Sequence, residues 1–68
     1  MEKFLKVEIA VYSQEEADIY VASLAEINFY AFEQNERFLN AYITEGDFSE
    51  KEFKEILPDN VVYKLMVI

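Results

Sequence analysis

The order of hydrophobic patterns along the chain restricts its fold more than any other feature. Apolar residues first alternate with polar ones, then recur every three or four positions, and then form two short aromatic and β-branched runs. A second, shorter helical stripe and a final apolar run follow. Alternation is typical of a strand and three- to four-residue spacing of a helix. The sequence therefore predicts strand, helix, strand, strand, helix, strand.

The first two elements have clear boundaries. Residues 5–11 alternate between apolar and polar side chains, which predicts a strand with one buried face. Ser13 and Glu16 have the spacing of a capping box, and apolar residues then recur at helical spacing up to Ile27. Asn28 stands where a residue in the left-handed conformation commonly ends a helix. We expect the first helix over residues 14–27.

The second half of the chain predicts a hairpin, a short helix and a last strand. The runs 29–34 and 38–44 flank Asn35-Glu36-Arg37 and are rich in aromatic and β-branched residues. Ser49 and Glu52 have the spacing of a second capping box, so a helix is expected over 49–57, ended by the turn at 58–60. Residues 61–68 form the last strand. In the hairpin, the aliphatic set is assigned to the core: Leu39, Ala41 and Ile43.

This order of elements is typical of an α+β fold, the ferredoxin-like βαββαβ two-layer sandwich. Its four-stranded antiparallel sheet carries two helices on one face. With 68 residues, the chain has room for a single small domain over 1–68. One helix layer leaves the other sheet face uncovered, and we expect an apolar patch there that is large for a small monomer. The expected members are Phe38, Tyr42 and either Val62 with Met66 or Tyr63 with Leu65.

Composition excludes most enzyme chemistries. The chain has no Cys and no His, so thiol nucleophiles, disulfides, zinc ribbons and imidazole acid–base pairs are all absent. A single Gly cannot build a glycine-rich phosphate loop. The dense carboxylates at 15–16 and 50–52 fall in first helical turns, where they complement the helix dipole. Residues 44–47 lack the ligand spacing of an EF-hand. We expect no catalytic, cofactor-binding or metal-binding residue in this chain.

Net charge narrows the class of partner. Fourteen acidic and six basic residues give −8, which opposes direct binding to nucleic acid or to an anionic membrane. It also argues against an RNA-recognition role for the aromatic residues of the sheet. A basic protein is the natural complement, although surplus acid also keeps an aromatic-rich domain soluble. No secretory signal or membrane-spanning stretch is evident, so we expect a cytoplasmic protein.

Several segments together resemble a known family. The pattern is similar to the amino-terminal domain of the bacterial ribosomal protein L-eleven methyltransferase, the PrmA family. Asn28 stands where that family usually has Gly, a replacement that a left-handed helix cap permits. The resemblance covers nearly the whole chain and is carried by Leu5-x-Val7, the segment 24–29, Ala31-Phe32-Glu33, the segment 39–43 and Phe48-Ser49-Glu50.

The resemblance implies a role in substrate recognition. In the PrmA family this small domain binds a basic ribosomal protein of the large subunit, while a separate downstream domain binds S-adenosylmethionine and methylates the substrate. We therefore expect this chain to be a non-catalytic fragment of a larger methyltransferase, without a cofactor of its own. Aromatic and acidic side chains just after the first helix are our predicted protein-binding residues, with Tyr30 and Phe32 alternatively in the core. The set is Glu26, Phe29, Tyr30, Phe32 and Glu33.

A second hypothesis comes from another class of protein. A stand-alone interaction module would cover its open sheet face by forming a homodimer, with Phe38, Tyr42 and Met66 inside the interface. Sedimentation separates the two ideas in part. A monomer that binds a basic ribosomal protein supports the first, whereas a tight dimer indifferent to that protein supports the second.

Overall fold

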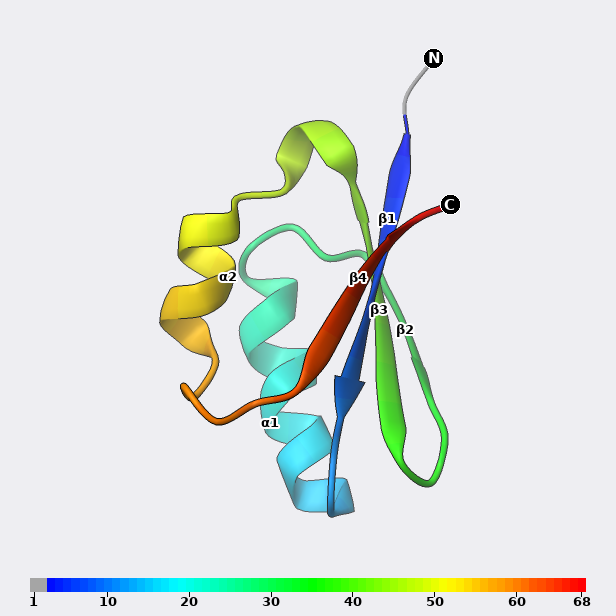
Figure 1. Cartoon of the computed structure of the whole chain (residues 1–68), viewed down its shortest axis with the longest axis vertical. Coiled ribbons are helices and arrows are strands. Elements are labelled where there is room, and N and C mark those ends of the chain that lie inside the picture. Colours follow the sequence, from blue (N-terminus) through cyan, green and yellow to red (C-terminus); the bar gives the residue numbers. More distant parts are fainter. Residues whose placement is uncertain (1–2) are drawn as a thin grey trace.

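The computed structural model describes residues 3–68 and has two layers, a four-stranded sheet and a pair of helices on one of its faces (Figure 1). The strand order is β2-β3-β1-β4, and every neighbouring pair is antiparallel. The predicted α+β sandwich is confirmed. Its elements are β1 (Phe4–Ala10), α1 (Gln14–Ala25), β2 (Ala31–Gln34), β3 (Phe38–Thr44), a 3₁₀ turn η1 (Glu45–Asp47), α2 (Glu50–Ile56) and β4 (Tyr63–Val67).

Strand register decides which side chains face the helices. Val7 of β1 lies opposite Ala41 of β3 and Leu65 of β4, and directly opposite residues of an antiparallel pair point to the same face. Odd-numbered residues of β1, β3 and β4 therefore face the helices, and even-numbered ones face away. The aliphatic set of β3 is buried, as predicted: Leu39, Ala41 and Ile43.

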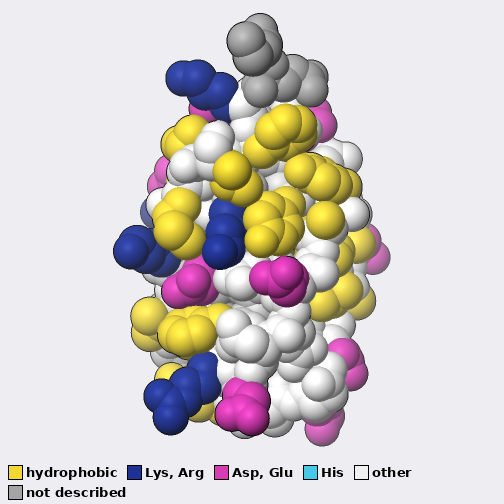
Figure 2. Space-filling view, turned by 90° about the vertical axis from the view of Figure 1, so that its right-hand side faces the viewer, with side chains coloured by type: hydrophobic (Ala, Val, Ile, Leu, Met, Phe, Trp, Pro, Cys, Tyr) yellow, Lys and Arg dark blue, Asp and Glu magenta, His cyan; other side chains and the backbone are white. Residues whose placement is uncertain are grey.

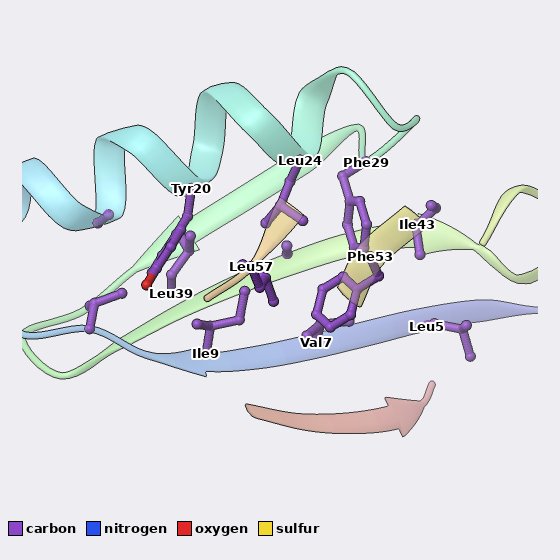
Figure 3. Packing of buried hydrophobic residues seen from close by; sticks show 13 residues of the cluster. Leu5, Val7, Ile9, Tyr20, Leu24, Phe29, Leu39, Ile43, Phe53 and Leu57 are labelled. Carbon is purple, nitrogen blue, oxygen red and sulfur yellow. The ribbon is translucent and has the colours of Figure 1, made fainter. Parts of the chain in front are cut away.

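The core lies between the sheet and the helices. Leu24 of α1 and Phe53 of α2 reach down onto the side chains of β1 and β3 (Figure 3). An aromatic cluster fills the space beneath α2, where Phe53 lies 6.1 Å from Phe29 and 4.9 Å from Tyr63 between ring centroids. The contact between Phe53 and Tyr63 is edge-to-face and that between Phe53 and Phe29 is tilted, and both add to the burial of apolar area. The cluster ties the segment after α1 to both α2 and β4.

The helix caps are those that the sequence predicts, and the helices differ slightly in length from the prediction. The Ser13 hydroxyl accepts a hydrogen bond from the Glu16 amide at 3.1 Å, and the Glu16 carboxylate accepts one from the Tyr12 amide at 3.2 Å. Helix α1 ends at Ala25, two residues before the predicted end, because 26–28 form a turn. Asn28 has φ of 79°, which confirms the predicted left-handed residue. Ser49 accepts from the Glu52 amide at 3.3 Å and caps α2.

The hairpin closes without glycine. The side-chain oxygen of Asn35 accepts hydrogen bonds from the amides of Arg37 at 3.0 Å and Phe38 at 2.8 Å, which holds the loop in an Asx turn. Strand β2 starts at Ala31, two residues later than predicted, and Phe29 before it is buried beneath the helices. Strand β4 is likewise shorter than the predicted run 61–68.

Candidate protein-interaction surfaces

Several hollows lie on the surface of the described residues. One lies between the start of α1 and the hairpin loop, and there the side-chain amides of Gln14 and Gln34 donate to each other at 3.0 Å. Their hydrogen-bonding capacity is thus already used in part. Within residues 3–68, no three acidic side chains come together in a group able to hold a metal ion. No helix in the described part of the chain is long and apolar enough to cross a membrane.

The sheet face away from the helices, here called the open face, is covered by neither helix (Figure 1 and Figure 2). It carries the even-numbered side chains of β1, β3 and β4. Hydrophobic groups gather in its half nearest the two chain ends. There the ring of Phe4 lies edge-on to Tyr30 with centroids 6.1 Å apart, and Tyr30 is 58% exposed. The structure settles the alternatives for β4, because Met66 pairs with Lys6 and faces outward whereas Leu65 pairs with Val7.

Two rows of side chains cross the middle of the open face. In the first, Lys6 lies between Tyr42 of β3 and Met66 of β4. In the second, which we call the polar row, the order from β2 to β4 is Glu33, Asn40, Glu8 and Lys64. The one ion pair found among residues 3–68 joins Lys54 to Glu50 on α2, with the nitrogen 2.9 Å from the oxygen. The two positive and two negative charges of these rows therefore have no ion-pair partner within the described chain.

Asn40 is unusual because it is polar, central and buried. Only 5% of its surface is exposed, and its side-chain oxygen has no hydrogen-bond donor. A buried acceptor without a donor costs about 1–3 kcal/mol, so most native proteins avoid one. The neighbours of Asn40 across the sheet are Glu8 and Glu33, which are acceptors themselves. The centre of the open face is thus polar and incompletely satisfied.

The helix side differs in charge from the open face. Helix α1 carries Glu15, Glu16 and Asp18 and has no basic residue. Tyr12, just before it, is 86% exposed, and Ile19 on the helix is 58% exposed. We call these five side chains the acidic α1 surface. Aromatic and aliphatic groups surrounded by carboxylates combine contact area with a field that attracts cations.

Tyr20 joins the acidic α1 surface to the core. Its side chain points from α1 toward Leu39 on β3 (Figure 3), and the residue is buried. Burial raises the pKa of the Tyr20 phenol from its usual 10.0, and the nearby Glu16 carboxylate raises it further. Both effects disfavour the charged phenolate. Tyr20 therefore remains neutral under ordinary conditions and acts as a packing residue.

The predicted binding residues do not form one surface. Phe29 is buried in the aromatic cluster, so in this fold it has no free surface for a partner. Phe32 is half-buried and lies opposite Ala41, on the helix-facing side of β2. Tyr30 is exposed, contrary to the alternative that placed it in the core. Glu33 and Glu26 are also exposed, Glu33 on the open face and Glu26 after α1.

The reason for this separation is the geometry of extended chain. Consecutive residues of a strand point to opposite faces, so side chains adjacent in sequence reach different surfaces. The position of each residue along the segment 29–33 therefore decides which surface its side chain reaches. The sequence predicted the capped helix but not the acidic α1 surface. Its exposed Tyr12 and Ile19 lie outside the apolar stripe that faces the core, so the helical spacing did not identify them.

Comparison with family models, with curated proteins and with solved structures finds no match to this chain. The single glycine, Gly46, lies in η1, in the connection between β3 and the short helix α2. The residues present therefore do not fit a glycine-rich nucleotide cradle.

Proposed function

We propose that this domain recognises a basic protein substrate on behalf of a methyltransferase, as its resemblance to the PrmA family implies. The substrate class is a basic ribosomal protein of the large subunit. Methylation takes place on a catalytic domain outside these residues, which binds S-adenosylmethionine. The observation that carries the proposal is the acidic α1 surface, where exposed Ile19 lies beside Glu15 and Glu16 and exposed Tyr12 lies beside Glu16, on a helix without basic residues.

Electrostatics and contact area have separate tasks in this proposal. The carboxylates of α1 attract a cationic protein and raise the rate of encounter, an effect that falls steeply with salt. Tyr12 and Ile19 supply apolar area at the centre of that field, and such groups commonly carry most of the binding free energy. The domain then raises the effective concentration of substrate near the catalytic domain. A substrate assembled into ribosomes would place the protein in the cytoplasm.

Titration calorimetry tests the proposal directly. The 68-residue domain is titrated with purified ribosomal protein L-eleven at low and at physiological salt. We expect binding that weakens as salt rises. The double variant Glu15→Lys/Asp18→Lys is expected to weaken association by about tenfold or more, because it removes two attractions and adds two repulsions.

A matched control separates this local effect from overall charge. Glu45→Lys/Asp47→Lys changes two exposed carboxylates of η1, which lies at the opposite end of the molecule from the start of α1 (Figure 1), and raises the net charge from −8 by the same four units. The control should weaken binding by about threefold at most, since charges beyond a Debye length are largely screened. Equal losses in the two variants, or no association of the unchanged domain, would contradict the proposal.

A further inference from the structure

The polar row of the open face contains a charge pattern that is complementary to itself. Its order from β2 to β4 is acid, amide, acid, base, and none of these charges has an ion-pair partner in the described chain. We propose that a second copy of this chain covers the open face. The two copies are related by a two-fold axis that lies in the interface between them. This axis runs parallel to β1 and β3 and lies over the gap between these two strands.

An axis in this position determines which strands face each other. It places β1 opposite β3 of the second copy and β2 opposite β4, while every cross-strand row stays opposite the same row. Within the polar row, Glu33 then faces Lys64 of the second copy. Glu8 lies over Asn40 of the second copy, but Asn40 is only 5% exposed, so the dimer rests on the outer contact of the row. The contact between Glu33 and Lys64 occurs twice, as two-fold symmetry requires.

The apolar rows match in the same arrangement. Tyr42 faces Lys6 of the second copy, which places an ammonium over an aromatic ring and is a favourable cation–π geometry. The outer row, with Phe4 and the neighbouring Tyr30, meets its own counterpart. A two-fold axis across the strands would lay each strand over its own copy. Placed between the two rows, it would bury carboxylates against aromatic and aliphatic groups; placed over the polar row, it would set Glu33, Glu8 and Lys64 each opposite the same charge, so the parallel axis is favoured.

Overall charge does not prevent this association. The acid of α1 lies behind the sheet, on the layer farthest from the second copy. Packed layers are about 10 Å apart, and physiological salt screens charges over about 8 Å. The four charged groups of the two central rows sum to zero. A standard interface needs about 800 Å² per partner, roughly a sixth of the 4773 Å² surface of the chain.

Sedimentation equilibrium of charge-swapped variants tests the proposal. The unchanged chain should be a dimer. Lys64→Glu places two acids opposite each other at both ends of the polar row, and Glu33→Lys places two bases there. Each single variant should weaken dimerisation by about tenfold or more. The double variant Glu33→Lys/Lys64→Glu restores opposite charges at the same two contacts, so its dimer should be about as tight as the original.

The matched control is Lys51→Glu on α2, which changes the net charge by the same amount as Lys64→Glu and lies on the helix side. It should leave the dimer within about twofold of the original. A monomer at all concentrations, or a dimer that neither single reversal weakens, would overturn the proposal. Neither result would contradict the proposed role of the acidic α1 surface. The monomeric Lys64→Glu variant should still bind the basic ribosomal protein through that surface.

Discussion

The same strands build two sheet faces with opposite characters. On the helix-facing side, Val7, Ile9 and Leu39 are completely buried, and their neighbours are aliphatic or aromatic. One residue along each strand, the open face has Lys6, Glu8 and the incompletely satisfied Asn40. Apolar packing without polar atoms stabilises the first face. The second keeps charges that have no ion-pair partner inside the described chain.

The largest expected effect tests whether stability resides on the helix-facing side. Phe53→Ala removes a ring that is 1% exposed and packs against Phe29, Phe48 and Tyr63, so it should lower the free energy of unfolding by about 3–5 kcal/mol. Phe38→Ala, on the open face, is the control and should cost about 1 kcal/mol. Urea unfolding followed by circular dichroism, at concentrations where the chain is monomeric, measures both. Equal losses of unfolding free energy in the two variants would contradict the view that the helix-facing side stabilises the domain more than the open face does.

Substitutions in the turn after α1 should have an effect on stability of intermediate size. Asn28 has φ of 79°, a conformation that costs a residue with a β-carbon about 1–2 kcal/mol. We expect Asn28→Ala to destabilise the domain by about 1 kcal/mol, whereas Asn28→Gly should leave it unchanged or slightly more stable. Thermal unfolding of the two variants provides the measurement. Destabilisation by glycine equal to that by alanine would show that the side chain of Asn28 matters more than its backbone.

Asn40 allows the opposite test, in which a change on the open face stabilises the monomer. Asn40→Leu replaces a buried amide whose oxygen lacks a donor with an apolar group of similar size. Removing that unmet acceptor should raise the free energy of unfolding of the monomer by about 1 kcal/mol. Because Asn40 is 5% exposed, the same change should leave dimerisation largely unchanged. A less stable monomer would mean that Asn40 is satisfied in solution.

The smallest expected effect concerns pH. Because folding raises the pKa of Tyr20 above 10.0, the stability due to its neutral form is complete below pH 10.0 and is lost as pH rises through the folded pKa. Tyr20→Phe should therefore lose less stability than the unchanged chain across that alkaline range. Tyr12→Phe, which alters an exposed ring, is the control. Identical alkaline slopes for Tyr20→Phe and the unchanged chain would contradict the assigned cause.

Local signals in the sequence predicted much of the fold. Ser13, Asn28 and Ser49 act through hydrogen bonds or backbone angles set within a few residues, and all three have the expected roles. The orientation of β4 was ambiguous because both of its faces are apolar. Only the pairing of Met66 with Lys6 resolves it. Pairing partners distant in the sequence are not encoded in any local pattern.

The candidate surfaces were harder to predict than the elements. The five residues predicted to bind a partner lie close together in the sequence, between Glu26 and Glu33. The structure nevertheless distributes them among the core, the open face and the end of α1. The polar row has the opposite property, since Glu8, Asn40 and Lys64 come from three strands far apart along the chain. Its charge order exists only once the register is known. The composition of this row therefore could not be predicted from the sequence alone.

The central position of β1 has a consequence for how the chain folds. Both neighbours of this strand come late in the sequence, and its outermost pair joins Leu5 to Val67. Loops that long are entropically costly to close, and proteins dominated by such distant pairings fold more slowly than those with local ones. During synthesis, β1 leaves the ribosome first but lacks its second neighbour until β4 has emerged. The domain should therefore acquire its native sheet only after translation has passed the last strand.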